Sequence, residues 1–408
     1  MINKNELPKN WEVSKLSEVV TKKTLKALPS DAPDAKFIGM DCIEPNGLKP
    51  AFLYDFKDFK SAGNRFKSGQ VLYGRMRPYL NKVYKAEFDG VCSGEFIILE
   101  CLPIFTPDLL QYILHSRDFV RFVNAKTSGD RPRISYEEIS DYPIYLPPLA
   151  EQERIVAKIE ELFSELDAGR ESLKTAARQL KTYRQAVLKW AFEGKLTNEN
   201  VSEGELPDGW KWKTIKEISS ILGDGLHGTP KYSTDGDYFF INGNNLTDGK
   251  IEIKENTKRV SKVEFEKHKK NLTDKTVFVS INGTLGNTAF YNNEKVILGK
   301  SACYFNVLNE IDKRFIRYCL TTNRFKSYAN KEATGSTIKN VGLKAMRGFE
   351  VPIPPTPEEQ QRIVEEIESR LSVCEKLEET INQSLAQSES LRQSILKQAF
   401  EGKLVNSQ

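Results

Sequence analysis

Polar loops that follow predicted strands carry the side chains best suited to recognition chemistry. In the first half of the chain, residues 74–79 and 128–133 hold four arginines. In the second half, residues 280–285 and 334–339 hold amides, hydroxyls and a lysine instead. Arginine can bind a guanine edge through two hydrogen bonds, asparagine can bind adenine in the same way, and Ser, Thr and Lys hold phosphates. The loops therefore favour contact with DNA.

The candidate DNA-contacting residues are charged, amide, hydroxyl or aromatic side chains in or beside these loops. In the first half they are Arg75, Arg77, Tyr79, Lys82, Lys126, Arg131 and Arg133. In the second half they are His227, Asn244, Asn245, Asn282, Thr284, Lys300, Ser336, Thr337 and Lys339. For any one of them, a solvated turn is the competing interpretation.

Motifs for catalysis and metal binding do not accompany these loops. The sequence lacks the Gly-x-x-x-x-Gly-Lys-Ser/Thr loop of ATPases, a Gly-x-Gly-x-x-Gly fingerprint and the Asn/Asp-Pro-Pro-Tyr/Phe motif of adenine methyltransferases. The six cysteines form no Cys-x-x-Cys pair, and no two of the three histidines stand at metal-ligand spacing. We therefore predict buried free thiols, no metal ligand and no catalytic residue.

The composition suits a soluble globular protein, because 39% of the residues are hydrophobic and 28% are charged. No run approaches the roughly 18 apolar residues of a membrane-spanning helix. The N-terminus also lacks the apolar core of a signal peptide. We expect a cytoplasmic protein with no membrane partner.

Short strands and amphipathic helices follow the same order in both halves, which predicts two mixed α/β domains. In the first half, strands are expected at 36–40, 70–74 and 95–99, and a helix at 107–123. In the second half, strands are expected at 237–241, 276–280 and 302–305, and a helix at 314–325.

Three motifs recur along the chain and indicate a tandem duplication. Glu-Gln-Glu-Arg-Ile-Val at 151–156 recurs 208 residues later as Glu-Gln-Gln-Arg-Ile-Val. Ala-Phe-Glu-Gly-Lys-Leu at 191–196 also recurs 208 residues later, unchanged. Leu-Pro-x-x-Trp at 7–11 recurs at 206–210, an offset of 199. Each half therefore combines an element of fixed length with a globular part of variable length.

Each fixed element is predicted to be one long helix with a single apolar seam. The first seam comprises Ile155, Ile159, Leu162, Leu166, Leu173, Ala176, Leu180, Tyr183 and Val187. The second comprises Ile363, Ile367, Cys374, Leu377, Ile381, Leu391 and Ile395, with Ser384 and Ser388 as softer positions. Proline pairs precede both helices, and Gly194 and Gly402 are expected to end them. A helix of about 45 residues would be about 68 Å long, so we predict that the seams pair as an antiparallel coiled coil.

The net charge of +4 is unevenly divided along the chain. Residues 151–196 contain 9 Lys/Arg and 8 Asp/Glu, and residues 358–404 contain 6 and 10, so the remaining residues carry +7. This positive excess lies in the globular halves, where a polyanion would bind. An ordinary solvated surface would also accommodate it.

This order of motifs resembles the specificity subunit of type I restriction–modification systems over essentially the whole chain. The helix entries that carry the resemblance are Leu-Pro-Pro-Leu-Ala-Glu-Gln at 146–152 and Ile-Pro-Pro-Thr-Pro-Glu-Glu-Gln at 353–360, each with Arg-Ile close behind. The helix ends, Arg-Gln-Ala-Val-Leu at 184–188 and Arg-Gln-Ser-Ile-Leu at 392–396, match as well. Two copies of each motif in this order make the resemblance specific.

The resemblance implies that each globular half is a target-recognition domain that reads one part of a split site in double-stranded DNA. The paired helices would act as a ruler, with half-sites separated by at most about 20 base pairs. They would also dock two modification (methyltransferase) subunits, which restriction (translocase) subunits would join. The docking and spacer residues would be Gln152, Arg154, Arg184, Phe192, Gln360, Arg362, Arg392 and Phe400.

On this interpretation the chain itself is non-catalytic and holds no cofactor. S-adenosylmethionine, ATP and Mg²⁺ would belong to the partner subunits. The expected segments are a first target-recognition domain at 1–149, a first spacer helix at 150–198, a second target-recognition domain at 199–356 and a second spacer helix at 357–408. Two alternatives are a DNA-recognition adaptor of another phage-defence complex and a coiled-coil scaffold whose globular ends bind protein.

Overall fold

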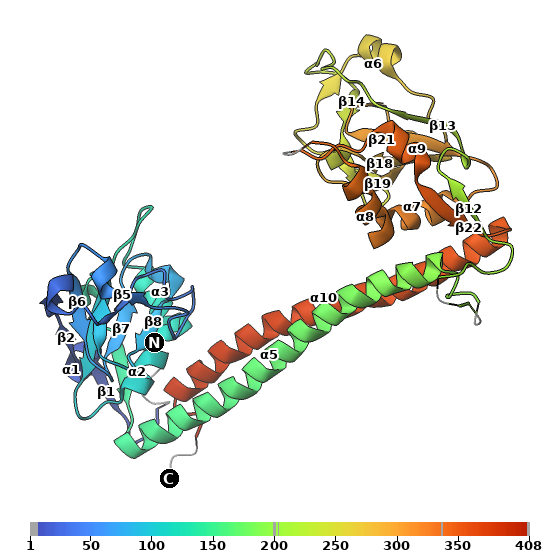
Figure 1. The fold of residues 1–408 in the computed structure, drawn as a ribbon. Coiled ribbons are helices and arrows are strands. Elements are labelled where there is room, and N and C mark those ends of the chain that lie inside the picture. Colours follow the sequence, from blue (N-terminus) through green and yellow to red (C-terminus); the bar gives the residue numbers. More distant parts are fainter. Residues whose placement is uncertain (1–6, 199–200, 203, 336–337, 406–408) are drawn as a thin grey trace. The chain divides into compact units, whose positions relative to one another are not determined.

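The computed structural model describes residues 7–198, 201–202, 204–335 and 338–405. It divides into two compact units that do not follow the order of the chain. One unit combines residues 1–174 with 382–408, and the other consists of residues 175–381. Each unit therefore contains one globular domain together with parts of both long helices (Figure 1).

The first domain consists of short strands and helices. In chain order they are β1 (Glu12–Lys15), α1 (Leu16–Val19), β2 (Val20–Lys23), β3 (Lys26–Ala27), η2 (Pro29–Asp31), β4 (Lys36–Ile38), β5 (Tyr54–Asp55), η3 (Phe56–Asp58), β6 (Gly63–Phe66), β7 (Val71–Gly74), η4 (Pro78–Leu80), β8 (Val83–Lys85), β9 (Gly90–Cys92), β10 (Phe96–Cys101), α2 (Pro107–His115), α3 (Arg117–Asn124), α4 (Tyr136–Ile139) and β11 (Pro143–Leu146).

The second domain follows a similar order. Its elements are β12 (Lys211–Thr214), β13 (Ser219–Asp224), β14 (Tyr238–Ile241), η5 (Gly243–Asn245), β15 (Leu246–Thr247), β16 (Lys250–Ile251), β17 (Arg259–Val260), α6 (Lys262–His268), β18 (Thr276–Ser280), β19 (Thr288–Phe290), β20 (Val296–Leu298), β21 (Ala302–Val307), α7 (Lys313–Thr321), α8 (Asn323–Glu332), α9 (Leu343–Gly348) and β22 (Glu350–Ile353).

The four-stranded sheet and one two-stranded sheet correspond in the two domains, which confirms the predicted tandem repeat of mixed α and β structure. The five-stranded sheet β3-β6-β9-β4-β5 of the first domain, by contrast, is replaced by the smaller sheets β17-β14-β20 and β15-β16 in the second. The four-stranded sheet β2-β10-β7-β8 has the counterpart β13-β21-β18-β19, and both are antiparallel. The pair β1–β11 corresponds to β12–β22. Each domain also contains one parallel pair, β4–β9 in the first and β14–β20 in the second.

The helix expected over 107–123 is instead two helices, and so is the helix expected over 314–325. The break falls at Ser116 in the first domain and at Thr322 in the second, where the backbone is extended. Each hydroxyl accepts a hydrogen bond from a backbone N–H three residues later, that of Phe119 or Phe325, and so caps a new helix. The periodicity was right, but it does not show this interruption.

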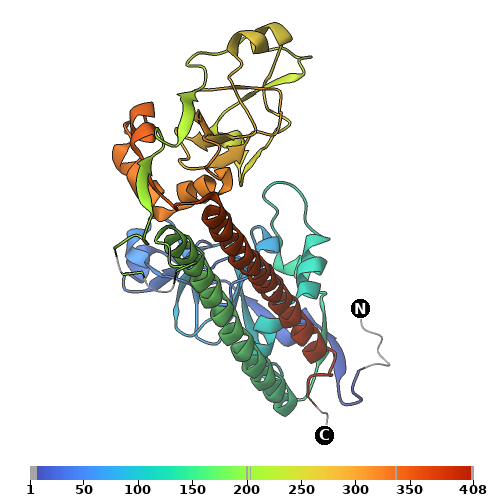
Figure 2. The ribbon, with the colours of Figure 1, turned by 90° about the vertical axis from the view of Figure 1, so that its right-hand side faces the viewer.

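Two long helices, α5 (Leu149–Phe192) and α10 (Pro357–Phe400), complete the fold. In each unit they run side by side in opposite directions, as both views of the ribbon show (Figure 1 and Figure 2). In the first unit Arg392 pairs with Asp167, and Glu389 pairs with Arg170, so a step forward on one helix is a step back on the other. This confirms the antiparallel arrangement of the predicted coiled coil.

The seam between the helices differs from the predicted one at Tyr183, Leu377 and Leu391, whose exposed fractions are 38%, 49% and 51%. Charged residues next to these positions form the contact between the helices instead. Glu378, for example, accepts a hydrogen bond from Nη2 of Arg184 at 2.9 Å. Ion pairs thus replace apolar contacts at these levels, while apolar residues such as Ile159 and Ile367 are fully buried near the domains.

The three repeated motifs meet in each unit at a contact that we call the joint. The first joint comprises Pro8, Trp11, Glu151 and Gly402, and the second comprises Pro207, Trp210, Glu359 and Gly194. In both, the tryptophan Nε1–H donates to the glutamate Oε1 at 3.0 Å. A Cβ on either glycine would lie 3.5 Å from the tryptophan ring and under 2.5 Å from the proline ring. Each joint therefore holds a domain against the start of one long helix and the end of the other.

The joint glycines end the long helices, as predicted. Gly194 has φ +74° and Gly402 has φ +70°. In the first case the N–H of Lys195 donates to the carbonyl of Trp190 at 2.8 Å, and Lys403 bonds Gln398 in the same way. This is the left-handed helix end that glycine permits without a steric penalty.

The cysteine prediction is confirmed, because all six thiols are free and five of them are buried, with Cys101 half-buried. Among the described residues, no group of three or more His, Cys, Asp or Glu side chains could hold a metal ion. The described helices also include none that is long and apolar enough to span a membrane.

Candidate nucleic-acid interface

In the first domain, the two polar loops predicted from the sequence lie together. Met76 and Arg133 form an antiparallel bridge. The N–H of Arg77 donates to the carbonyl of Pro132 at 2.7 Å, and the N–H of Ile134 donates to the carbonyl of Arg75 at 3.1 Å. Residues 75–77 and 132–134 thus form a short ladder, which we call the first paired loops.

The second domain builds the same ladder from residues 281–283 and 339–341, the second paired loops. Asn282 and Asn340 form the bridge. The N–H of Gly283 donates to the carbonyl of Lys339 at 3.0 Å, and the N–H of Val341 donates to the carbonyl of Ile281 at 2.8 Å. The bridged residues are 57 positions apart in the first half (76 and 133) and 58 in the second (282 and 340), and the fold brings them together in both.

The loops share an unusual backbone conformation as well. Arg77 and its counterpart Gly283 both have positive φ, at 50° and 75°, and so do Asn81 at 50° and its counterpart Gly286 at 86°. Glycine adopts this region freely, whereas a side chain costs roughly 1–2 kcal/mol there. Arg77 keeps its side chain at a position where glycine would fit better, and such strain is typical of functional sites.

Most predicted side chains of the first domain remain accessible. Tyr79 is 48% exposed, Arg131 is exposed, and Arg75 and Arg77 are half-buried. The Arg133 guanidinium bonds the Glu95 carboxylate, with Nε at 3.1 Å from both oxygens and Nη2 at 2.9 Å from Oε1. This contact raises the pKa of Arg133, so the group stays charged.

Lys126 and Lys82, the two predicted lysines of the first domain, behave differently. Lys126 is exposed, and its Nζ donates to the carbonyl of Glu138 at 2.7 Å. Lys82 is 9% exposed, and its Nζ donates to the carbonyl of Met40 at 2.6 Å. Burial lowers the pKa of Lys82. Its assignment as a DNA contact was therefore wrong, because its ammonium serves the interior of the domain.

In the second domain, Asn282 donates from Nδ2 to Oδ1 of Asn340 at 3.3 Å. Thr284 is exposed, and exposed Lys339 bonds Oδ1 of Asn330 at 2.6 Å. Ser336 and Thr337 lie outside the described residues.

Three further candidates of the second domain lie outside the second paired loops. Two of them are in neighbouring segments: Lys300 precedes Ser301, whose carbonyl accepts from the N–H of Ile281, and Asn244 lies in η5. His227 is exposed, with Nε2 at 2.6 Å from Oδ2 of Asp224. Lys300 is exposed, and its N–H donates to the carbonyl of Leu226, so these two candidates stand on adjoining segments. Asn244 is also exposed.

Asn245 is not available for contact with a ligand. It is 5% exposed, its Oδ1 accepts from the N–H of Asn242, and its Nδ2 donates to the carbonyl of Glu252. A buried amide must satisfy its hydrogen-bonding groups inside the protein. Its prediction as a DNA-binding residue was therefore wrong.

Three of the predicted docking residues are buried. Gln152 has no exposed surface and its Nε2 donates to the carbonyls of Ile104 and Pro147, and Gln360 is equally committed to residues 310 and 312. Phe192 packs on Phe315 at 5.0 Å between ring centroids. They fasten a domain to a helix and leave no surface for a partner, so their assignment to docking is corrected.

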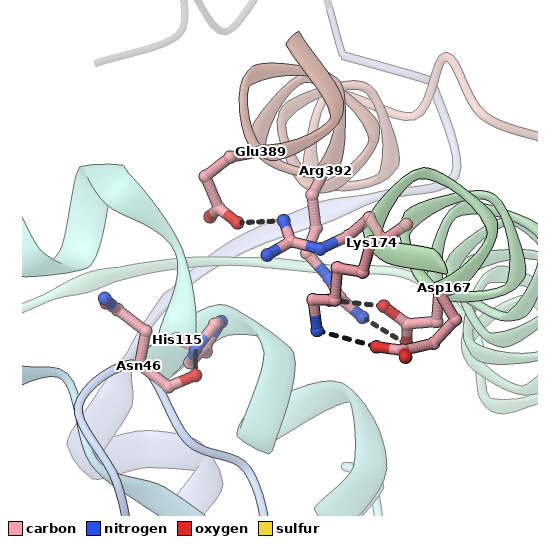
Figure 3. Close-up of polar contacts among 8 residues, drawn as sticks. Asn46, His115, Asp167, Lys174, Glu389 and Arg392 are labelled. Atoms are coloured by element: carbon pink, nitrogen blue, oxygen red, sulfur yellow. Dashed lines mark hydrogen bonds and ion pairs between the residues drawn. The ribbon is translucent and has the colours of Figure 1, made fainter. Parts of the chain in front are cut away.

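The other five predicted docking residues have varied surroundings. Arg154 and Arg362 are exposed at equivalent places, and half-buried Phe400 packs against the core of the first domain. Arg392 bonds both oxygens of Asp167 at 3.1 Å (Figure 3). Arg184 pairs with Glu378. The last two therefore hold the long helices together.

Glu95 and Asn340 were missed by the sequence reasoning, although both stand in the paired loops or bond to them. Glu95 lies at the start of a strand more than 35 residues from Arg133, and no local pattern connects the two. Asn340 directly follows the predicted segment 334–339. The duplication is the signal that could have found it, because Asn340 is the residue of the second repeat equivalent to Arg133 of the first.

The family comparison agrees with this duplicated architecture. The family model of the type I restriction modification DNA specificity domain matches the chain twice, at residues 8–174 and 207–387. The chain belongs to this family. Each match contains one globular domain and a large part of the helix that follows it, so the two specificity domains are the two halves of the duplication.

The curated relatives that match this chain include specificity subunits of type I restriction enzymes. The specificity subunit of the type I restriction enzyme StySPI from Salmonella potsdam is 26% identical, in a match that covers 99% of this chain and 91% of that subunit. The EcoDI specificity subunit from Escherichia coli is 30% identical, over 47% of this chain and 43% of that subunit. The match to the EcoBI subunit covers 64% of its length. The chain thus spans less than two thirds of the EcoDI and EcoBI subunits.

Solved structures share the fold of this specificity-domain protein. A chain from work on complex assembly and conformational transition of the type I R-M system superposes with a TM-score of 0.78 at 21% identity, covering 97% of this chain and 99% of its own. The HsdS subunit from Thermoanaerobacter tengcongensis gives a TM-score of 0.63 at 21% identity, covering 97% and 98%.

Proposed function

We propose that this chain is the non-catalytic specificity subunit of a type I restriction–modification complex and reads a bipartite site in double-stranded DNA. The observation that carries the proposal is the pair of ladders. One backbone frame occurs twice, in two specificity domains, with different polar side chains at equivalent positions. Two readers of two different half-sites require this combination.

We further propose that the domains at 1–149 and 199–356 each read one half-site, while the long helices serve as a spacer and dock two modification subunits. Arg154 and Arg362 support the docking role, since they are exposed at equivalent places near the starts of α5 and α10. Restriction subunits join this assembly. S-adenosylmethionine, ATP and Mg²⁺ are held by those partners, and this chain holds none of them.

Reconstitution tests the proposal. The full chain is purified alone and in complex with its modification subunits, and methyl transfer from labelled S-adenosylmethionine to genomic DNA is measured, with modified adenines mapped by sequencing. We expect no transfer by the chain alone, and methylation of one bipartite sequence by the complex. A duplex with one half-site scrambled is the matched control, and it should remain unmethylated.

Two results would contradict the proposal in different ways. Methylation by the chain alone would show that it is catalytic. A complex that forms but binds no DNA would favour a protein-binding scaffold. Replacement of residues 1–149 by the corresponding domain of another family member should change one half-site only, because the second domain and both helices stay as they are.

A further inference from the structure

Arg133 and Asn340 occupy the same position in the two domains, and this equivalence rests on backbone contacts alone. Arg133 faces Met76 in the first ladder, and Asn340 faces Asn282 in the second. In both ladders the residue after this position donates its N–H to the loop that follows the central strand β7 or β18. The two side chains therefore leave equivalent points of the fold.

The Arg133 side chain is held so that one edge of its guanidinium remains available. The Nε and Nη2 groups bond the Glu95 carboxylate, and Nη1 bonds no residue that the structure describes. Arg133 is 46% exposed and Glu95 is 30% exposed. The outer edge carries an N–H of Nη1 and the second N–H of Nη2, and Nη2 lies 3.7 Å from Sδ of Met76, a weak acceptor that a base can replace. Such a pair of donors matches the N7 and O6 acceptors of guanine.

Asn340 offers the complementary chemistry in the second domain. Its amide presents one acceptor and one donor group, which match the N6–H and N7 of adenine. The Asn282 side chain donates to Oδ1 of Asn340, an oxygen that can accept a second hydrogen bond. Asn282 therefore orients the Asn340 amide as Glu95 orients the Arg133 guanidinium. A side chain that is already oriented loses less conformational entropy on binding.

We propose that Arg133 reads a guanine in one half-site and that Asn340 reads an adenine at the matching place of the other, with Glu95 and Asn282 as positioning residues. This assignment rests on the proposed function and names the bases recognised. The Glu95 carboxylate accepts from both Nε and Nη2 of Arg133, and this two-point contact fixes the direction of the guanidinium.

The test maps the methylation sequence of the assembled complex for the wild-type chain and for the Arg133→Ala and Asn340→Ala variants. Arg133→Ala should lose about tenfold to a hundredfold of its preference at one guanine of one half-site. Asn340→Ala should lose a similar preference at one adenine of the other. In each variant the unchanged half-site shows that the chain is folded and assembled. Arg121→Ala, which removes an exposed arginine of α3 outside the paired loops, is the control and should leave both sequences unchanged.

A second measurement covers a variant that binds too weakly to map. The wild-type complex is bound to duplexes in which each guanine of the half-site is replaced in turn by 7-deazaguanine, which lacks the N7 acceptor. Affinity should fall at one guanine, and Arg133→Ala should no longer distinguish that duplex from the unmodified one. Glu95→Gln should weaken the preference for this same guanine, whereas a structural role would affect all base pairs alike.

The outcomes separate this assignment from the proposed function. If the wild-type complex has no bipartite sequence, the proposed function fails. If it has one, but Arg133→Ala leaves the preference intact, relaxes a base other than guanine or relaxes both half-sites, the guanine assignment is wrong and the proposed function stands. The adenine assignment to Asn340 fails by the same criteria.

Discussion

Both domains contain a joint and a set of paired loops. The joints have the same residues in the two domains, whereas the paired loops have different side chains. Both joints contain the same proline, tryptophan, glutamate and glycine, with the same 3.0 Å hydrogen bond from indole to carboxylate. The paired loops also keep their backbone hydrogen bonds, yet Arg133 stands in one copy and Asn340 in the other. Buried contacts tie the joint residues to one another, whereas side chains that reach solvent can change without unfolding their frame.

If this comparison is correct, the largest loss of stability will come from the joint glycines. A Cβ on Gly402 would lie 2.4 Å from Cγ of Pro8, and one on Gly194 would lie 2.1 Å from Cγ of Pro207. Alanine would also have a steric cost in the left-handed backbone conformation of these positions, at φ +70° and +74°. Each substitution should therefore cost about 2 to 5 kcal/mol of the free energy of unfolding.

The measurement is denaturant unfolding, with hydrogen exchange to assign the loss to one unit. Gly402→Ala should destabilise the first unit and Gly194→Ala the second. Gly169→Ala is the matched control, since nothing lies within 4 Å of its Cβ position inside α5. It should stabilise the helix by about 1 kcal/mol. If Gly169→Ala and Gly402→Ala changed the free energy of unfolding equally, the close packing of the joint would not be the cause of the loss.

A smaller loss is expected when the joint hydrogen bond is cut. Glu151 is 3% exposed and accepts from Nε1 of Trp11 and from Nδ2 of Asn10. Glu151→Ala leaves the buried indole N–H without its acceptor, which should cost about 1 to 3 kcal/mol of the free energy of unfolding. Glu153→Ala, two residues further along and exposed, should change it little. A similar effect of both variants in urea unfolding would contradict this role.

Acid should destabilise the first unit more than the second. Helix α2 of the first unit ends at His115, whereas the equivalent helix α7 of the second unit ends at Thr321. His115 is 3% exposed, and its Nε2 lies 3.1 Å from the carbonyl oxygen of Asn46 (Figure 3). Burial, helped by the charge of Arg392, lowers the pKa of His115, while Asn46 and Glu389 act in the opposite direction. The folded state therefore binds this proton less readily than the unfolded state does.

The sign of the pH dependence follows from that difference. The stability that His115 contributes is complete above the ordinary histidine pKa of about 6.5 and declines as the pH falls from there toward the lowered pKa. The slope is at most about 1.4 kcal/mol per pH unit. Hydrogen exchange at pH 5 and pH 7 should show the loss in the first unit. His115→Thr, which supplies the residue found at the equivalent Thr321, should abolish it, and persistence of the slope in this variant would assign it to other groups.

The sequence predicted the parts of this molecule that local patterns encode. Helical periodicity and the 208-residue repeat gave both long helices and their ends at Gly194 and Gly402. Strand pairing is not local, so Glu95 could not be connected with Arg133 before the fold was known. The direction of a side chain is equally hidden, which is why Lys82 and Asn245 were assigned to DNA although both bond backbone groups inside the domain.

A small gain in stability is expected in the first paired loops. Arg77 has φ 50° where its counterpart Gly283 has φ 75°. Arg77→Gly removes the steric cost of a left-handed side chain and should raise the free energy of unfolding by about 1 kcal/mol. The same variant should bind its DNA site more weakly, because a cationic side chain is lost from the proposed interface.

The reciprocal variant sharpens this test. Gly283→Ala places a side chain at the equivalent left-handed position, so it should lower the free energy of unfolding by about 1 kcal/mol without removing a charge. Unfolding in urea and binding to the mapped duplex are measured for both variants. Opposite signs of the stability change, with DNA affinity reduced in Arg77→Gly despite its greater stability, would show that the arginine is retained for binding. If Arg77→Gly is less stable than the wild type, the side chain supports the loop itself, and the strain at Arg77 cannot be attributed to function.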